Sequence, residues 1–544
     1  MATHEVLNQP PPLRDYNIFT ADRALQDALQ REGGGWAADR VALLGGICGS
    51  GEVIDWGVQA NAAPPVLRTH DRYGHRLDEV EYHPAYHRLM ELSVGHALHA
   101  LPWREPRDGA HVARAALFFV MGQTEAGHGC PISMTYSAVP ALRADPALAR
   151  EWQPRLMATR YDGRGRPAAE KAGALCGMAM TEKQGGSDVR ANTTRAEPAG
   201  DGGWLLTGHK WFCSAPMCDV FLVLAQAPKG LSCFLLPRWL PDGTRNRFFL
   251  QRLKDKLGNR SNASSEVEFD GAWARLLGPE GRGVPTIIEM VNHTRLDCII
   301  GAAAGMRHGV AQATHHAQHR STFGKRLIEQ PLMQNVLADL CVESEAATAA
   351  MMRLAHAYDA RNDEGEAHFA RLATAVMKYW VCKRWPAHAA EALECLGGSG
   401  YVEESLLPRL YREAPLNGIW EGSGNVICLD VLRAVAKGPE AADAFFAEVE
   451  RAHGADPRLD QFVTRLRDDL TSADGIEARA RDLVERLALA LQASLLVRDG
   501  DPAVAEAFCA SRLAAQHGLA FGTLPPGFHF TRIIERARPT LSGA

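Results

Sequence analysis

The spacing of apolar residues changes twice along this chain, and that change limits the possible folds more than any single motif does. Up to about residue 176, apolar residues recur mainly at helical spacing. Short apolar runs then follow one another, separated by turns rich in Gly, Pro, Asp and Asn. The runs are Trp204–Thr207, Val220–Leu224, Ser232–Leu236 and Ser265–Phe269. Long helical patterns return at about residue 284, so we expect an α+β protein that is mainly helical.

The chain divides into four predicted regions, because 544 residues exceed one ordinary hydrophobic core. Residues 1–176 form an N-terminal extension and a helical domain, within which residues 64–87 are expected to be irregular. Residues 177–283 form a small antiparallel β domain. Residues 284–436 carry the pattern of a helical bundle. Residues 437–544 form an additional helical domain after the linker Lys437-Gly438-Pro439.

Composition and cysteine spacing indicate a globular protein of a reducing compartment. Hydrophobic residues make up 46% and charged residues 23%, and the net charge of −5 suggests no particular partner. The 12 cysteines include no C-x-x-C pair, which predicts reduced, buried thiols and a cytoplasmic location. No apolar run approaches membrane-spanning length, and the N-terminus lacks a signal-peptide pattern, so no membrane association is expected. His315 and His319 have ligand-compatible spacing, but without an H-E-x-x-H pattern we expect no metal site.

The stretch Ile419–Asn425 places one carboxylate, Glu421, between a bulky apolar pair and a Gly-Ser-Gly turn. Burial between apolar walls disfavours the charged form, which raises the pKa of a glutamate and suits it to accept a proton near neutral pH. The run Val426–Arg433 reads as a buried helix directly behind it. Read alone, the same stretch also fits an ordinary surface turn.

Two segments of the predicted β domain have residues suited to a flat polar ligand. Met180–Asp188 combines hydroxyl side chains with paired glycines, which let backbone N–H groups approach a ligand closely. In Gly208–Ser214, Phe212 and Ser214 are two residues apart and share one face of a strand. A planar ring system lying against Phe212 would place its edge near Ser214. Core packing is the alternative for that segment.

Six segments between Met180 and Asn425 resemble, in order, motifs of the acyl-CoA dehydrogenase flavoprotein superfamily. They are Met180–Asp188, Gly208–Ser214, Lys256–Ser261, Arg320–Gln334, Glu394–Tyr401 and Glu421–Ser423. The resemblance implies an N-terminal helical domain, a β domain and a four-helix bundle in a homotetramer with bound FAD. It also implies α,β-dehydrogenation of an acyl thioester, with Glu421 as the catalytic base. Some members carry the base on the first helix after the β domain, where this chain has Thr294.

The resemblance further implies which residues contact FAD, and one segment is expected to reach the FAD of a neighbouring subunit. The expected cofactor-binding residues are Met180, Thr181, Gly186, Ser187, Phe212, Ser214, Arg320, Phe323, Gln330, Gln334, Gly397, Gly398, Trp420, Gly422, Ser423 and Asn425.

The chain is longer than ordinary members of this superfamily. Its sequence is similar to that of one branch, the AidB-type proteins of the bacterial response to DNA alkylation. The similar stretches are Asn8–Leu13, Arg31–Trp36, Thr69–Gly74, Thr181–Asp188 and Asn417–Asn425. That likeness implies weak dehydrogenase activity on short branched substrates such as isovaleryl-CoA. It also implies binding of double-stranded DNA through the C-terminal region.

The charge of the C-terminal region gives only limited support to DNA binding. Residues 437–544 contain 13 Lys and Arg against 16 Asp and Glu, whereas a DNA-binding surface concentrates positive charge. The arginines most suited to such a surface are Arg465, Arg467, Arg479, Arg481 and Arg486. Two alternatives stay open: a catabolic short- or branched-chain acyl-CoA dehydrogenase with no DNA role, and a DNA-binding scaffold with a vestigial flavin.

Overall fold

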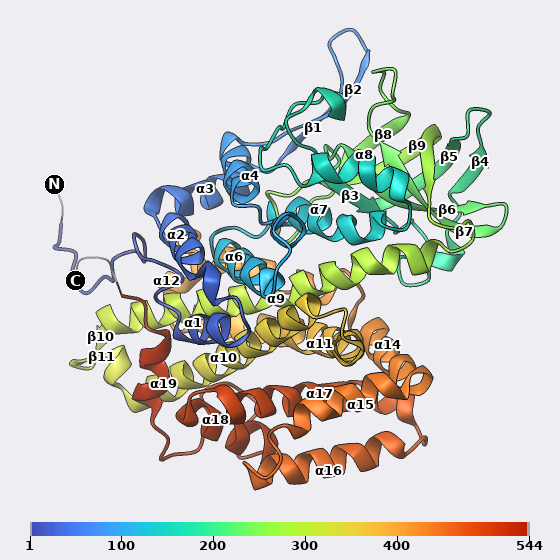
Figure 1. Ribbon diagram of the computed structural model, residues 1–544. Helices are drawn as coiled ribbons and strands as arrows, with labels where there is room; N and C mark the ends of the chain where they lie inside the picture. Colours follow the sequence, from blue (N-terminus) through green and yellow to red (C-terminus); the bar gives the residue numbers. More distant parts are fainter. Residues whose placement is uncertain (1–2, 541–544) are drawn as a thin grey trace. The chain divides into compact units, whose positions relative to one another are not determined.

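The computed structural model describes residues 3–540, which cluster into two compact units. The helical unit lies within Met1–Ile54, Arg107–Thr124 and Arg295–Ala544. The sheet unit comprises Asp55–Pro106 and Glu125–Thr294. Helices α3 (Gly51–Ala62) and α9 (Gly283–His319) continue from one unit into the other. Figure 1 labels most of the helices and strands.

The sheet unit contains nine strands and a set of mostly short helices. The helices that lie wholly within it are α4 (Pro84–Gly95), α5 (Leu101–Arg104), α7 (Gly129–Leu142) and α8 (Pro146–Leu156), with 3-10 turns at Ala168–Glu170 and Val189–Ala191. The strands are β1 (Val66–His70), β2 (Arg76–Glu81), β3 (Cys176–Ala179), β4 (Arg195–Pro198), β5 (Trp204–Ser214), β6 (Val220–Ala227), β7 (Gly230–Pro237), β8 (Phe248–Leu253) and β9 (Ser264–Leu277).

The seven strands from β3 to β9 form one sheet whose pairings close into a cycle. Strand β6 pairs with β4, β4 with β5, β5 with β9, β9 with β7, and β7 with β6, while β3 adds to β6 and β8 to β9. The predicted antiparallel pairing holds for most neighbours, but β3 and β4 both run parallel to β6. Strand β6 is almost continuously apolar because both of its faces are buried.

The helical unit consists of long helices with short connections. Its other helices are α1 (Arg23–Arg31), α2 (Ala38–Cys48), α6 (Ala110–Thr124), α10 (Pro331–Asp359), α11 (Glu364–Glu394), α12 (Gly398–Tyr401), α13 (Leu407–Glu413), α14 (Gly424–Lys437), α15 (Pro439–Glu450), α16 (Pro457–Thr471), α17 (Ile476–Asp499), α18 (Pro502–Phe508) and α19 (Phe530–Ala537). Short turns of 3-10 helix lie at Gly35–Ala37, Leu327–Glu329 and Leu416–Gly418, a π-helical turn at Cys509–Leu513, and a two-residue hairpin joins β10 (Ser321–Thr322) to β11 (Lys325–Arg326).

The C-terminal helices pack on the bundle and do not form a separate body. Helices α15 and α17 contact α11, and α17 and α18 contact α10 (Figure 1). Two of these helices begin with the same Asp-Pro pair. At Asp456-Pro457 and Asp501-Pro502 the aspartate accepts a hydrogen bond from the N–H two residues on, and the proline occupies the first helical position, where no N–H is needed.

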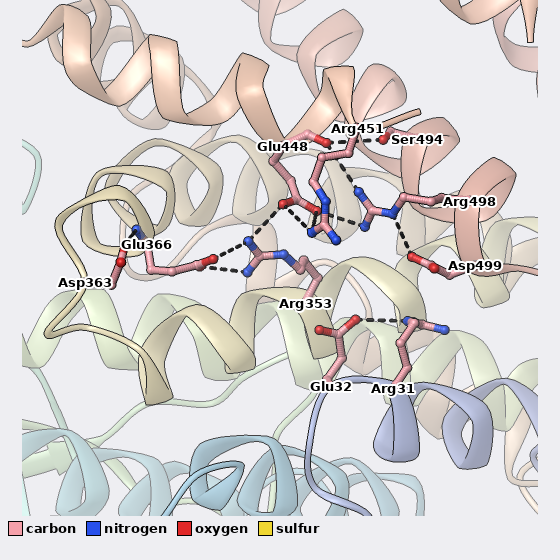
Figure 2. A network of polar contacts seen from close by, with 10 residues as sticks. All are labelled: Arg31, Glu32, Arg353, Asp363, Glu366, Glu448, Arg451, Ser494, Arg498 and Asp499. Atoms are coloured by element: carbon pink, nitrogen blue, oxygen red, sulfur yellow. Dashed lines mark hydrogen bonds and ion pairs between the residues drawn. The ribbon is translucent and has the colours of Figure 1, made fainter. Parts of the chain in front are cut away.

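A buried ionic network joins the C-terminal helices to the bundle (Figure 2). Glu448 of α15 contacts Arg353 of α10 at 3.0 Å, Arg451 at 3.1 Å and Arg498 of α17 at 3.0 Å. Arg353 also forms two hydrogen bonds to Glu366 of α11, at 2.8 and 2.9 Å. Burial raises the pKa of Glu448, but hydrogen bonds and charge from Arg353 and Arg498 outweigh it and lower the pKa to about 2.

The predicted order of helical, β and helical regions is confirmed, as is helical structure after Lys437. The expectation of irregular structure at residues 64–87 is wrong, because β1 and β2 pair there as an antiparallel hairpin and α4 begins at Pro84. Polar side chains on these exposed strands hide the alternation that marks a half-buried strand. All 12 cysteines are free and buried, as predicted.

Residues 3–540 show neither a clustered metal-ligand set nor a single membrane-spanning helix. No group of three or more His, Cys, Asp or Glu side chains is arranged to hold a metal ion within that range. No single described helix has the length and apolar character of a membrane span, although the bent pair Gly35–Cys48 and Gly51–Ala62 passes that test jointly.

Replacing Glu448 by Gln should lower the free energy of unfolding by about 3 kcal/mol at pH 7, because it leaves buried arginines without their shared carboxylate. The pKa of Glu448 in the folded protein, about 2, lies below the usual 4.5. Its contribution is therefore complete above pH 4.5 and is lost as the pH falls toward 2. Urea unfolding of wild type and variant at several pH values measures both effects.

The matched control is Arg451→Gln, since the Arg451 side chain is 58% exposed and an exposed ion pair contributes less than about 1 kcal/mol. Equal losses of unfolding free energy in the two variants would contradict the buried network as the main link between the C-terminal helices and the bundle.

Candidate active site

The loop that carries Glu421 is held by two buried cations of the helical unit. Lys378 of α11 is 1% exposed, and its Nζ donates at 2.7 Å to the carbonyl oxygen of Trp420 and also to that of Gly422. Arg295 of α9 donates from Nε to the carbonyl oxygen of Glu421 at 3.1 Å. Three successive carbonyl groups are therefore turned toward positive charge.

These contacts stabilise a strained backbone. Glu421 has a φ of 59°, which costs a residue with a side chain about 1–2 kcal/mol. Gly422 follows at 103°, and a Cβ there would lie 2.9 Å from Cδ1 of Ile427. A glycine is therefore required at position 422, and an isolated loop would not hold this shape without Lys378 and Arg295.

Arg295 is itself held by a carboxylate. Its Nη1 donates to Asp430 of α14 at 2.9 Å, and Asp430 also accepts from Arg371 of α11 at 2.9 Å. Burial raises the pKa of Asp430, but the charges of Arg371 and Arg295 outweigh it and lower the pKa overall. Asp430 thus stays ionised at neutral pH and keeps Arg295 against the loop.

The apolar surroundings predicted for Glu421 are only partly present in the helical unit. Trp420 is half-buried and donates from Nε1 to Oδ1 of Asn417 at 2.8 Å, but Ile419 is 64% exposed. Ile419 therefore does not shield the Glu421 carboxylate from water, because the loop turns the Ile419 side chain outward. A raised pKa for Glu421 stays a prediction. Helix α14 begins at Gly424, two residues before the predicted Val426.

In the sheet unit, a buried ion pair holds the predicted flavin loop. Glu182 is fully buried, and its carboxylate accepts from Lys210 Nζ at 2.8 Å, Thr193 N at 2.7 Å and Thr194 N at 3.1 Å. Burial opposes ionisation, but the Lys210 charge and these donors keep the pKa of Glu182 well below its usual range. The acidic residue of this motif is thus an anchor for the loop.

The loop anchored by Glu182 lies beside β5. The backbone N–H of Trp211 donates to the carbonyl oxygen of Thr181 at 2.8 Å. Thr181 also faces Gly186, where an added Cβ would lie 2.4 Å from the Thr181 hydroxyl oxygen. Gly186 and Ser187 are exposed, and Met180 is half-buried. The structure therefore brings the four predicted loop residues together at the edge of β5.

The predicted placement of Phe212 and Ser214 on one face of a strand is confirmed. Phe212 is 50% exposed and Ser214 half-buried, whereas Cys213 between them is buried on the other face. The Ser214 hydroxyl lies 3.4 Å from that of Ser264, and Lys254 lies 4.7 Å above the centre of the Phe212 ring. Core packing is therefore excluded for Phe212.

The segment from Arg320 to Gln334 forms a hairpin with an exposed tip. Phe323, at a φ of 52°, is 99% exposed and occupies the turn with Gly324. Gln330 Nε2 donates to the Thr322 hydroxyl at 2.8 Å, and Gln334 Nε2 donates to the Ile328 carbonyl at 3.0 Å. These predicted cofactor-binding glutamines therefore shape the hairpin and the start of α10. Arg320 donates to the Asn8 carbonyl oxygen at 2.5 Å.

Two other predicted positions have simple local roles. Gly397 has a φ of 58° and precedes α12, and a side chain at Gly397 or Gly398 would meet open space. At the alternative base position, the hydroxyl of Thr294 donates to the Val291 carbonyl at 3.0 Å within α9.

Four of the five arginines predicted to bind DNA have contacts within the helical unit. Arg467 pairs with Glu450 at 2.5 Å, and Arg486 pairs with Asp469 at 2.5 Å. Arg479 donates to the carbonyl groups that follow α16, including Ser472 at 2.9 Å. Arg481 donates to Asn425. Arg465 is exposed and has no hydrogen bond or ion pair among the described residues.

Comparison with known proteins connects these features to a family. A model of the AidB N-terminal domain matches residues 8–163, the acyl-CoA dehydrogenase middle domain matches residues 177–272, and the C-terminal domain matches residues 281–436. AidB of Escherichia coli (strain K12) is 47% identical over 519 residues, which cover 95% of this chain and 96% of that protein. The chain belongs to the AidB branch of the acyl-CoA dehydrogenase family.

Solved structures agree with this assignment. Caenorhabditis elegans ACDH-11, solved in complex with C11-CoA, has a TM-score of 0.85 and 27% identity, with 94% of both chains covered. The apo form of Bd2924 has a TM-score of 0.81 and 28% identity, covering 90% of this chain and 98% of that one. Family membership confirms the predicted fold class, FAD as cofactor and the class of FAD-dependent oxidoreductase.

The residues at hand fit FAD. In the sheet unit, the exposed ring of Phe212 and the Ser214 hydroxyl offer a flat apolar surface with a polar group near it, and Gly186 is exposed. In the helical unit, Gly397 and Gly398 leave the backbone accessible. Sequence reasoning missed Lys378 and Arg295. A signal for Lys378 existed, because it is the only charge in the apolar run Ala375–Cys382 of α11.

Replacing Lys378 by Met should loosen the Glu421 loop, because three carbonyls lose one of their two cations. We expect hydrogen exchange at amides 420–425 to become about tenfold faster, the effect of losing a charge-assisted hydrogen bond. Mass-spectrometric exchange of the intact protein measures this. The control is Lys383→Met, an exposed lysine on the same helix, which should leave these amides unchanged. Equal exchange in the two variants would contradict the role of Lys378.

Proposed function

We propose that this protein is an AidB-type flavoprotein of the response to DNA alkylation, which binds double-stranded DNA and has weak dehydrogenase activity on short branched acyl-CoA substrates such as isovaleryl-CoA. The observation that carries the chemistry is the Glu421 loop, a carboxylate on strained backbone held by Lys378 and Arg295. The likeness to AidB extends over 95% of the chain, including the C-terminal region, and supports the rest.

Glu421 would remove the α proton of the acyl thioester. When bound, FAD accepts the β hydrogen as hydride. The backbone also contributes. Carbonyl and N–H groups of one trans peptide point in opposite directions, so Lys378, by holding the Trp420 carbonyl, turns the Glu421 N–H away from itself. Charge on that carbonyl also strengthens the N–H as a donor, which suits it to stabilise negative charge on the thioester oxygen.

The proposed assembly is a homotetramer. Its support is the hairpin tip, where Phe323 is 99% exposed on a two-residue turn. Leu332, the second residue of α10, is 84% exposed. Large apolar side chains this exposed to water are unfavourable for a single copy, and a neighbouring subunit would cover them. By the family resemblance, this segment would reach that subunit's FAD. A cytoplasmic location is proposed on the 12 reduced, buried cysteines.

A catabolic dehydrogenase without a DNA role is the second candidate. It is favoured by the acidic balance of residues 437–544, with 13 basic against 16 acidic side chains. The pairing of Arg467 and Arg486 with carboxylates also reduces the positive charge that they offer to phosphates. Arg465 keeps its charge unpaired among the described residues and is the natural first contact to test.

Replacing Glu421 by Gln should abolish flavin bleaching by isovaleryl-CoA under anaerobic conditions, at least about a thousandfold in rate, because the amide cannot accept the proton. FAD should stay bound at wild-type stoichiometry. The control is Glu364→Gln, an exposed glutamate in the first turn of α11. Bleaching by the Glu421 variant would require another base. A wild-type protein that binds FAD but is not bleached would support the scaffold with a vestigial flavin.

Binding of the flavin-loaded intact chain to duplex DNA should weaken steeply with salt. Replacing Arg465 by Gln should make the slope of log K against log salt less negative by about one, the loss of one phosphate contact. Arg195→Gln, an exposed arginine in β4, should leave the slope unchanged. Absence of binding at low salt would leave the catabolic dehydrogenase as the better account.

A further inference from the structure

A direct hydrogen bond joins the C-terminal region to the loop that carries Glu421. Arg481, in the second turn of α17, donates from Nε to Oδ1 of Asn425 at 2.8 Å. Asn425 is the second residue of α14, four positions after Glu421. The same side chain also lies beside the neighbouring Gly424, where an added Cβ would be 3.5 Å from Nη2 of Arg481 and 3.4 Å from the ring of Tyr379. Arg481 therefore closes the C-terminal end of the loop.

A second contact links α17 to the helix that holds the loop. Three consecutive residues of α11 make three different contacts. Lys378 donates to the loop carbonyls, Tyr379 packs beside Gly424, and Trp380 donates from Nε1 to Oε1 of Gln492 at 3.1 Å. Gln492 is a buried residue of α17. Helix α17 thus contacts the loop directly through Arg481, and it contacts α11, the helix that supports the loop, through Gln492.

The hydrogen bonds that α9 and α11 donate to the loop carbonyls reach only its first part. Lys378 and Arg295 bind the carbonyl oxygens of Trp420, Glu421 and Gly422. Ser423, which precedes α14, makes no side-chain capping bond to the helix. Arg481 supplies the side-chain contact at the point where the loop enters α14. Since φ of Glu421 is strained, movement at either end of the loop would displace the carboxylate.

We propose that Arg481 is a positioning residue for Glu421, through which the C-terminal helical region holds the loop in its active conformation. This assigns the region a part in the dehydrogenase site in addition to any partner that it binds. A ligand that competes for Arg481, such as a DNA phosphate, would release Asn425 and loosen the loop. The reciprocal effect follows from linkage, because whatever orders the loop favours the Arg481–Asn425 contact and disfavours the competing ligand.

Removing the chain after Lys437 would remove Arg481 and Gln492 together, and it would leave buried Arg353 without Glu448. A truncated protein would therefore lose loop support and DNA contacts at once. Single substitutions in the full chain separate the two.

The test compares Arg481→Ala, Arg481→Lys and the control Arg433→Ala in the full-length protein. Arg433 is an exposed arginine of α14 without a hydrogen bond or ion pair among the described residues. Three quantities are measured: hydrogen exchange at amides 420–427, the dissociation constant of FAD from the apoprotein by flavin fluorescence, and the rate of flavin bleaching by isovaleryl-CoA. We expect Arg481→Ala to speed exchange and slow bleaching, each about tenfold, with Tm changed little.

Arg481→Lys should recover part of both effects, because it restores a positive donor with a different shape. At saturating isovaleryl-CoA the loss should persist, as expected for misplacement of the base rather than weaker substrate binding. Loop exchange in Arg481→Ala equal to that in Arg433→Ala would overturn the proposal. So would a uniform rise in exchange across the chain with a matching drop in Tm, since that marks a purely structural role.

The activity readout rests on the proposed function, but the exchange readout does not. If isovaleryl-CoA fails to bleach the wild-type flavin, the proposed dehydrogenase activity fails. Faster exchange confined to residues 420–427 would then still establish Arg481 as the anchor of the loop, and unchanged exchange would refute it.

Discussion

Positive charge directed at backbone carbonyl groups is the interaction on which the candidate site depends. Lys378 and Arg295 bind the carbonyl oxygens of Trp420, Glu421 and Gly422, and they do so from helices that also contribute many residues to the core. A left-handed glutamate is unfavourable by itself, and a buried lysine without partners is more so. The two offset each other. Lys378 holds the strained loop, and the loop carbonyls replace the water that Lys378 lost on burial. The strained conformation of Glu421 is thus a property of the surrounding helices.

The C-terminal region shows the same reliance on buried charge. Glu448 lies among three arginines, and the network extends from α15 and α17 to α10 and α11 (Figure 2). Low dielectric makes such contacts strong when they are complete and costly when one member is missing. These helices therefore form one cooperative unit with the bundle. Arg481 uses that rigidity, since its own hydrogen bond to Asn425 is exposed and depends on α17 being held in place.

Much of the fold could be predicted from the sequence because its signals are local. Long runs at helical spacing predicted the helical regions 284–436 and 437–544, in which α10, α11 and α17 lie, and short apolar runs between turns predicted β5, β6, β7 and β9. The hairpin of β1 and β2 could not be found in this way, because both of its strands are polar and mostly exposed. The parallel pairing of β3 and β4 with β6 was also missed, since residue spacing along one strand carries no information about the direction of its neighbour.

The sequence by itself determined the family and the candidate base, because motif residues such as Glu421-Gly422-Ser423, Phe212 and Ser214 are recognised by identity and order. Only the tertiary structure decided what the charged residues do. Glu182 is an anchor, Arg479 and Arg486 are bonded within the chain, and Lys378, Arg295 and Arg481 hold the loop. The physical reason is that the effect of a charge depends on its distance to other groups and on the surrounding dielectric, and the partners here are tens to hundreds of residues away along the chain.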